Sequence, residues 1–206
     1  MTDLVATRRS LHAVAELLLA GPQYAASGTI KLRPTPAGFG TVRTPDTRVV
    51  GTDLVGPQGQ VSLPGRAIQD VAAEAGLTVR SLGDVYSDGA GLAPEHVLHI
   101  DAAAAHEIAD AFRIGDVALA SLAPDVDRVL WPEHFDLGLA LDEVNYGVSA
   151  GDSFLEVPYA YVGPWSRDRV SGSFWNAPFG AARPLAEVPD VGAFFAEGRA
   201  LVAASR

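Results

Sequence analysis

The fold is decided by residues 130–165, which read LWPEHFDLGLALDEVNYGVSAGDSFLEVPYAYVGPW. Leu137, Leu139 and Leu141 alternate with small or polar residues, which is typical of a strand with one buried face. Glycine and proline recur at short intervals, so the strands are expected to join through turns rather than through helices. The stretch therefore predicts antiparallel strands near 134–141, 143–148 and 155–163.

An earlier part of the chain matches this stretch. Residues 30–57 align without a gap on residues 137–164, with six identical positions, including the Val-Gly-Pro triplets at 55–57 and 162–164. Glycine and proline restrain turns, so two copies of one supersecondary unit would carry them at matching places. Chance combined with common turn chemistry is the other interpretation. We expect the duplication, and hence the same backbone path in both segments.

The remaining residues extend this pattern into two halves, each reading helix, strands, helix. Helices are expected over 3–20, 67–75, 102–122 and 190–204, with Gly21-Pro22 ending the first and Asp101 capping the third. Further strands are expected over 29–33, 38–43, 48–55 and 96–100, and a short extended piece over 172–176. The fold class is α+β: a mainly antiparallel sheet with flanking helices, in a single domain of residues 1–206 with halves of about 1–95 and 96–206.

Composition narrows the classes of function. The chain has 206 residues, 15 basic and 25 acidic, a net charge of −10 and no cysteine. The absence of cysteine excludes disulfides, thiolate metal sites and cysteine nucleophiles. With one lysine and no basic run, nucleic acid is not an expected partner. No apolar run approaches the length that a membrane-spanning helix needs, so no membrane partner is expected either. The expected location is cytoplasmic.

His134 and Asp136 form the central candidate pair. In a strand they would share one face with Gly138 and Ala140, whose small side chains leave room for another backbone or for a ligand. A histidine beside a carboxylate suits acid–base work, and a histidine satisfied by its neighbours is the plain alternative. A metal would need a third ligand that the sequence does not identify, so no metal and no cofactor is expected.

Aromatic and polar residues that follow could complete a pocket, because tyrosine and tryptophan combine an apolar body with a polar tip. Ordinary packing of aromatic residues in the core is the alternative. The residues assigned to ligand binding are Glu133, Tyr146, Ser149, Asp152, Tyr159, Tyr161, Trp165, Trp175 and Asn176. Ser149 also lies in Gly-Val-Ser-Ala-Gly, but a nucleophile elbow requires a helix after the serine and a histidine later in the chain. Here a strand is expected next, and the last histidine is His134.

The motifs WPEHFDL at 131–137, SAGD at 149–152 and PYAYV at 158–162 resemble a bacterial domain-of-unknown-function family. Its members typically show W-P-x-H-F-D, S-P-G-D and P-E-P-Y-x-Y-V. This chain has Ala150 where the family has proline and Val157 where it has glutamate. The family's later W-H-x-x-G-W-x-G-A resembles residues 174–181, with Asn176 where a histidine is common. The resemblance covers about a quarter of the chain well, and it implies no activity.

Three functions remain open from the sequence. The first is a small-molecule-binding protein with its pocket on the face of His134 and Asp136. The second is an enzyme of the hydrolase or isomerase type that uses His134 as acid or base, oriented by Asp136. The third is a structural or protein-interaction module. The oligomeric state, the ligand and the pathway are not encoded in any pattern that we recognise.

Overall fold

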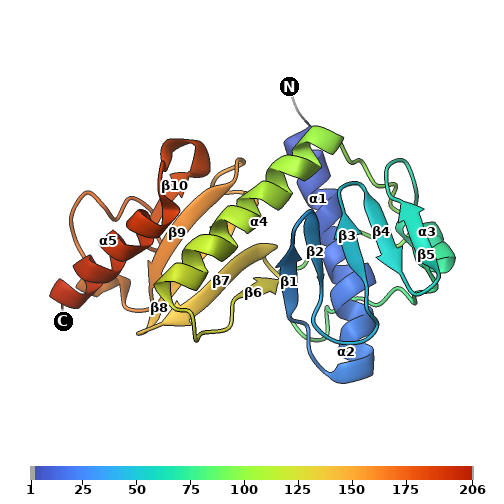
Figure 1. Cartoon of the computed structure of the whole chain (residues 1–206), viewed down its shortest axis with the longest axis horizontal. Helices are drawn as coiled ribbons and strands as arrows, with labels where there is room; N and C mark the ends of the chain where they lie inside the picture. The colour runs from blue at the N-terminus through green and yellow to red at the C-terminus, as the bar shows by residue number, and fades with distance from the viewer. Residues whose placement is uncertain (1–2, 206) are drawn as a thin grey trace. The chain divides into compact units, whose positions relative to one another are not determined.

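The computed structural model describes residues 3–205 and has an α+β fold with a mainly antiparallel sheet, as the sequence predicts (Figure 1). The helices are α1 (Leu4–Val14), a π-helical segment (Ala15–Ala20), α2 (Gly21–Ser27), α3 (Ile68–Ala75), α4 (Ala102–Leu122), α5 (Val191–Ala204) and the 3-10 turns Arg167–Arg169 and Leu185–Glu187. The strands are β1 (Leu32–Thr35), β2 (Gly38–Thr41), β3 (Arg48–Val50), β4 (Asp53–Gly56), β5 (Gly59–Ser62), β6 (Val129–Trp131), β7 (Asp136–Leu141), β8 (Val144–Ser149), β9 (Tyr159–Pro164) and β10 (Ala181–Pro184).

The chain forms two compact units. Unit 1 comprises Met1–Asp110 and Leu130–Phe135, and unit 2 comprises Ala111–Val129 and Asp136–Arg206. The expected division near residue 95 lies in a loop, whereas the observed division cuts α4 and returns residues 130–135 to the first unit. The reason is that Leu130 pairs with Leu32 of β1, so this segment joins the sheet of unit 1.

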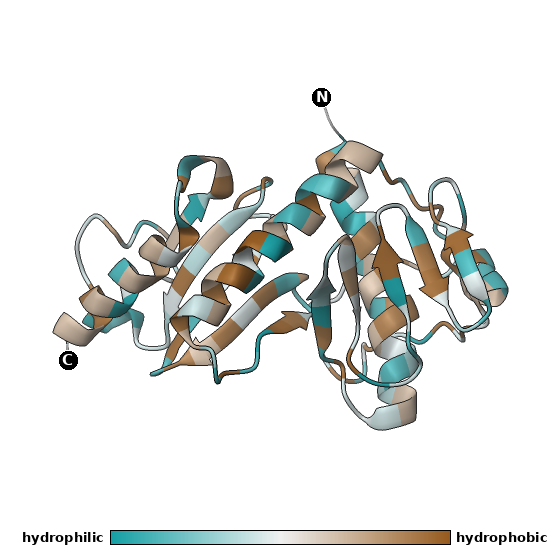
Figure 2. Ribbon diagram, in the orientation of Figure 1, coloured by the Kyte–Doolittle hydropathy of each residue, from teal (hydrophilic) through white to brown (hydrophobic). Residues whose placement is uncertain are grey.

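Unit 1 is a meander with strand order β6-β1-β2-β3-β4-β5. Phe39, Val49, Leu54 and Val61 stand opposite one another on β2 to β5 and are all buried, so they form one core row. Figure 2 shows hydrophobic and hydrophilic residues alternating along these strands, as expected for a sheet with one buried face. The Phe39 ring meets the edge of Phe135, which in turn stacks on a histidine of α1.

The first helix is longer than the sequence predicts. Gly21-Pro22 was expected to end it, but helical backbone continues to Ser27 through the π-helical segment. Pro22 lacks an N–H, and the carbonyl of Leu17 accepts instead from the backbone N–H of Arg80 (3.2 Å). Gly21 permits this contact, because a Cβ there would overlap the Arg80 carbonyl. A distant segment therefore satisfies the helix where its own sequence cannot.

Unit 2 has strand order β7-β8-β9-β10. One face carries buried Leu137, Tyr146, Val148 and Val162 and is covered by α4 and α5. Glycines on the two helices permit close packing. A Cβ at Gly115 of α4 would lie 2.9 Å from Val148, and one at Gly198 of α5 would lie 2.9 Å from Val162. The alternation of leucines in β7 predicted this buried face correctly.

The predicted repeat is wrong in register. The hairpin β1-β2 turns between Thr35 and Gly38, which the alignment places on Asp142 and Asn145, whereas the hairpin β7-β8 turns between Leu141 and Val144. The two turns are thus displaced by a single position, and Leu139 pairs with Tyr146, whereas the pairing of Leu32 with Thr41 would place it opposite Val148. The next strands also differ, because residues 48–50 of β3 align with residues 155–157, which form no strand, whereas β4 aligns with β9. The halves share the order helix, meander, helix, but not the register of the aligned residues.

Several element boundaries differ from the expected ones. The expected strand at 48–55 is two strands, β3 and β4, joined at Gly51-Thr52. Residues 96–100 form only an isolated bridge, and 172–176 contain no strand, whereas β10 was not foreseen. The cap of α4 was predicted correctly, since Asp101 accepts from the Ala104 N–H at 2.9 Å. At the start of α5, Asp190 accepts from the Ala193 N–H at 2.9 Å, a cap that was not foreseen.

Candidate functional site

The face of the unit 2 sheet opposite α4 and α5 carries a phenol–carboxylate pair. Gly138 and Gly147 stand opposite each other on β7 and β8, and Tyr161 of β9 stands opposite Gly147. The Tyr161 phenol lies across both glycines, and its hydroxyl donates to Oδ2 of Asp136. A Cβ at Gly138 would lie 2.9 Å from the Tyr161 hydroxyl oxygen. The room that the sequence indicated beside Gly138 is therefore occupied by a side chain of the same chain.

A second phenol–carboxylate pair lies one row along the same face. Asp136, Ser149 and Tyr159 stand opposite one another on β7, β8 and β9. The Tyr159 hydroxyl donates to Oδ2 of Asp152 (2.6 Å), while Oδ1 of Asp152 accepts the N–H groups of Phe154 (2.7 Å) and Leu155 (3.0 Å). Asp152 thus fixes the loop between β8 and β9 and orients the tyrosine at the same time.

Both tyrosines are held in the protonated form. Burial raises the pKa of Tyr159 above its usual value, and the hydrogen bond to Asp152 raises it further. The pKa of Tyr161 is also raised well above its usual value. Burial is the largest cause, and the negative charge of Asp136 is the second. At neutral pH each phenol is a hydrogen-bond donor and not a base. The two phenols therefore hold carboxylates in place and do not themselves act as bases.

Aromatic rings surround the two pairs. Phe154 contacts Tyr159 and Phe179 edge to face, and Phe179 also contacts Tyr161. Phe154 and Phe179 are 41% and 38% exposed, so they form an apolar outer edge around buried polar groups. Phe154 was not among the aromatic candidates from the sequence, and its contacts with Tyr159 and Phe179 arise only from the pairing of strands and loops.

His134 does not lie in a strand. It occupies the turn before β7, its side chain is 56% exposed, and its Nε2 lies 3.4 Å from Oε1 of Glu133. The expected alternation of His134 with Asp136 is wrong, because β7 begins at Asp136 and Phe135 has φ = 51°. The left-handed backbone at Phe135 breaks the period of two on which the prediction depended. Asp136 is engaged by Tyr161, and His134 has Glu133 as its nearest carboxylate.

The other assigned residues are placed by the structure as follows. Tyr146 is 1% exposed on the opposite face, with its ring against Phe195 of α5. Trp175 is buried beside Phe174, and Trp165 is exposed with its indole N–H donating to Asn145 (3.1 Å). Asn176 forms two hydrogen bonds with the backbone of one β10 residue, Ala182, at 2.9 and 3.0 Å. The assigned set is therefore divided between two faces of the sheet.

Ser149 is the last residue of β8, and its environment matches the simpler interpretation of Gly-Val-Ser-Ala-Gly. It is buried, and its Oγ accepts the Gly151 N–H at 3.1 Å. The residues that follow form a loop, and β9 comes after it. A nucleophile elbow requires a helix at this point. The glycines serve the strand and the turn.

A buried polar cluster in unit 1 was missed from the sequence. Glu16 of the π-helical segment is 6% exposed, and its Oε2 accepts the Ala90 N–H at 2.8 Å. The Tyr86 hydroxyl is buried without a hydrogen-bond partner among the described residues. Burial raises the pKa of Tyr86, and the negative charges of Glu16 and Glu133 raise it further. A glutamate inside an apolar helical run was the only sequence signal for this cluster.

His12 of α1 also lies in unit 1 and is uncharged at neutral pH. Its Nε2–H donates to the Pro132 carbonyl (2.7 Å), and its ring stacks on Phe135 at a centroid distance of 5.5 Å. Burial lowers its pKa to about 4, against the smaller opposing effect of the Pro132 hydrogen bond. His12 therefore anchors the turn that carries Glu133 and His134.

An open groove on the outer side of α4 and α5 was also missed, and its volume is about 960 Å³. The main residues that line it are Arg113, Ile114, Val117, Ala118, Leu122, Ala193, Ala196, Arg199 and Ala200. Val117 is 61% exposed and Ile114 is 37% exposed. Their spacing places them on one stripe of α4. No function was assigned to this stripe from the sequence.

Comparison of the chain with family models, with curated proteins and with solved structures finds no match. Within residues 3–205, no group of three histidine or carboxylate side chains is positioned to hold a metal ion. No helix in the described part of the chain is long and apolar enough to cross a membrane.

Proposed function

We propose that this chain is a protein-interaction module whose groove between α4 and α5 binds an amphipathic helix of a partner protein. The observation that carries the proposal is the exposed apolar lining of the groove. Val117 and Ile114 present large aliphatic side chains to solvent, and the α5 side contributes alanines. Small residues opposite branched ones allow a helix to approach closely.

The open shape of the groove favours an extended partner over a small molecule. Pockets for small molecules have volumes of about 300–1,000 Å³ and enclose most of the ligand surface. This groove reaches about 960 Å³ along two exposed helix faces, so it would leave a small ligand largely in water. A helix of three or four turns, about 16–22 Å long, would cover the apolar stripe.

The charged residues of the groove indicate which charges the partner helix would carry. Arg113 on α4 and Arg199 on α5 both line the groove. Arg199 forms an ion pair with Asp142 at 3.2 Å, but both side chains are about half exposed. Replacing this pair with an ion pair to the partner therefore costs little free energy. Asp190, an acidic residue of the lining, accepts the cap hydrogen bond of α5. The matching helix would carry glutamates beside an apolar stripe.

A synthetic peptide tests this function. The probe is a fluorescein-labelled helical peptide with leucine and alanine at helical spacing and glutamate on its flanks, and its partner probe has lysine in place of every glutamate. We expect the acidic peptide to bind and Val117→Glu to weaken it about tenfold or more, since it places a charge in an apolar contact. Val157→Glu is the matched control, because Val157 is exposed in the loop before β9.

The outcomes separate the alternatives. Equal binding of both peptides, or equal loss in Val117→Glu and Val157→Glu, contradicts a specific groove. A dimer by light scattering that Val117→Glu dissociates would show that a second copy of the chain occupies the groove instead. Both measurements use the full chain and need no knowledge of the natural partner.

A second candidate function, binding of a small molecule, is supported by the exposed Phe154 and Phe179 beside the Tyr161–Asp136 pair. The polar groups of this face offer acceptor oxygens, so its ligand would carry donors such as an amine. Native mass spectrometry of protein purified from its own host tests it. A retained small molecule that is lost in Phe179→Ala would favour this function, and its retention in that variant would place the ligand elsewhere.

A further inference from the structure

Two arginines face each other across a glycine in the sheet of unit 1. Arg33 of β1 and Arg48 of β3 both stand opposite Gly40 of β2. All three residues lie on the face of the sheet opposite to the core row of Phe39 and Val49. Strands lie about 4.8 Å apart, so the two arginine backbones are about 10 Å apart. Two side chains of this length can reach one group placed above the glycine.

Gly40 provides the floor of this arrangement. A Cβ at this position would lie 3.0 Å from the Cβ of Arg48 and 3.2 Å from the Thr47 carbonyl oxygen. Gly40 is buried, so the side chains around it cover this backbone, and a larger residue would crowd Arg48. A glycine within a strand often marks a position that another group approaches closely.

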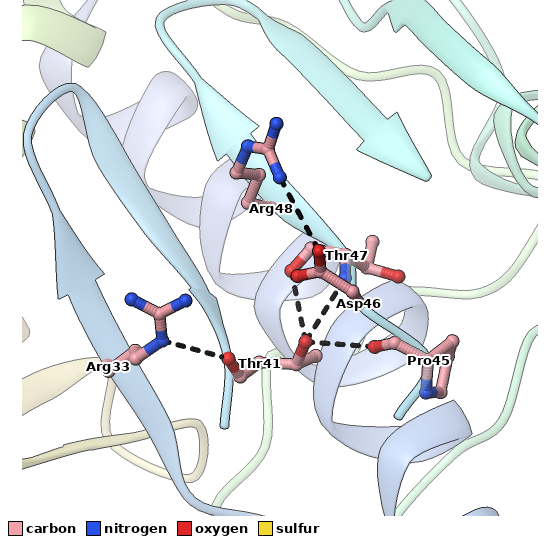
Figure 3. A network of polar contacts seen from close by, with 6 residues as sticks. All are labelled: Arg33, Thr41, Pro45, Asp46, Thr47 and Arg48. Atoms are coloured by element: carbon pink, nitrogen blue, oxygen red, sulfur yellow. Dashed lines mark hydrogen bonds and ion pairs between the residues drawn. The ribbon is translucent and has the colours of Figure 1, made fainter. Parts of the chain in front are cut away.

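The loop beside the arginines is held by a dense network of polar contacts (Figure 3). The Thr41 hydroxyl donates to the carbonyls of Pro45 (2.9 Å) and Thr47 (3.3 Å) and accepts the Thr47 N–H (3.1 Å). Gln23, which is fully buried, accepts the N–H groups of Val42 and Arg43 at 2.7 Å each. Both ends of the loop are therefore fixed, and Arg43 is presented next to the row.

The arginines retain hydrogen-bonding capacity. Arg33 uses its Nε for the Thr41 carbonyl (3.1 Å), and Figure 3 shows its guanidinium and that of Arg48 on the side of the strands away from the helix behind them. Arg48 lies 3.7 Å from Asp46, whose side chain is 78% exposed, so this pair is weak. Residues 31–48 hold four basic residues and one acidic residue, in a chain of net charge −10.

We propose that Arg33 and Arg48 form an oxyanion-binding site over Gly40, for a phosphate or carboxylate group of a small molecule. A single guanidinium group binds such an oxyanion through two parallel N–H···O bonds, which the ammonium of lysine cannot reproduce. The surrounding negative charge of the chain disfavours a long polyanion, so a single anionic group fits better than nucleic acid. This site is independent of the groove in unit 2.

Titration with inorganic phosphate and, in a separate experiment, with citrate tests the site. The readout is the NMR chemical shift of the Gly40 amide and of the Nε–H groups of Arg33 and Arg48. We expect saturable shifts confined to these signals. Arg48→Gln should weaken binding about tenfold, and Arg48→Lys should recover only part of it. Arg169→Gln is the control, because Arg169 is an exposed arginine in unit 2 and should leave binding unchanged.

The result distinguishes the sources of the anionic group. Tighter phosphate binding points to a phosphorylated molecule, and tighter citrate binding points to a carboxylate. Shifts that do not saturate, or that are equal in Arg48→Gln and wild type, overturn the proposal. Binding of a random DNA duplex at the same signals, with steep salt dependence, would also overturn it in favour of a nucleic-acid surface. The side-chain contact of Arg48 with Asp46 is exposed and weak, so folding of the variant is expected.

Discussion

The two units use glycine differently on the sheet faces turned away from their core rows. In unit 1, Gly40 is buried between two arginines, one on each neighbouring strand. In unit 2, Gly138 and Gly147 are covered by Tyr161, whose hydroxyl reaches Asp136. The same absence of a Cβ thus leaves room between two charged side chains in one sheet and room for an aromatic ring in the other. A glycine pattern alone does not tell which kind of side chain will pack beside it.

The largest expected effect tests the covered glycines. Gly147→Ala should destabilise the protein by about 3 kcal/mol, because the new Cβ would lie 2.5 Å from Cζ of Tyr161 and 2.6 Å from the Leu137 carbonyl oxygen. Gly40→Ala should cost about 1 kcal/mol, since its nearest contacts are 3.0 and 3.2 Å. Urea denaturation measures both changes. Equal losses would mean that Tyr161 yields easily and that the two faces do not differ in packing.

The units should also respond to opposite ends of the pH scale, and acid affects unit 1. The pKa of His12 is lowered to about 4, so the folded state favours the neutral ring. The resulting stability is present above about pH 6.5 and is lost as the pH falls toward 4. The loss should be about 2–3 kcal/mol between pH 7 and pH 4.5.

Comparison with His12→Gln isolates this contribution, because a glutamine amide can still donate to Pro132 but does not titrate. Denaturation of both proteins at pH 7 and pH 4.5 is the measurement. The variant should lose less stability than wild type over this interval. Parallel losses would assign the acid sensitivity to carboxylates common to both proteins.

Alkaline pH affects unit 2 through its tyrosines. The raised pKa of Tyr161 means that its stabilising contribution is complete below about pH 10 and is lost as the pH rises above that value. Tyr161→Phe should cost about 2 kcal/mol at neutral pH, because Asp136 loses a donor. It should also flatten the alkaline loss, as read from melting temperatures between pH 8 and 11.

Tyr159→Phe is the matched control for this change. Asp152 would keep the N–H groups of Phe154 and Leu155, so the cost at neutral pH should be smaller, about 1 kcal/mol. A larger loss of stability in Tyr159→Phe than in Tyr161→Phe would contradict this. It would mean that the row of Ser149 and Tyr159 stabilises this face more than Tyr161 over the covered glycines does.

The smallest effect concerns His134. It is 56% exposed in a turn, so His134→Ala should change stability by no more than about 0.5 kcal/mol. A thermal melt measures this. A loss of about 1–3 kcal/mol would instead indicate an unsatisfied buried partner and would restore this histidine to a structural role.

The sequence predicted those features that depend on neighbours along the chain. The alternation in β7 predicted the buried Leu137 and Leu139, and Asp101 predicted the start of α4, because periods and caps act within a few residues. The turn chemistry likewise predicted an antiparallel α+β fold. The pairing of His134 with Asp136 failed at one residue, Phe135, whose positive φ is not encoded by its type.

Only the tertiary structure decided which distant residues meet. Arg33 and Arg48 lie on strands that are not consecutive in the chain, and they became neighbours because both pair with Gly40. The same holds for Tyr161 and Asp136, and for the Arg80 N–H that satisfies the helix before Pro22. Strand register and loop path set these contacts, and a register error of a single position exchanges every face. The sequence by itself therefore determined the elements, whereas the tertiary structure decided the sites.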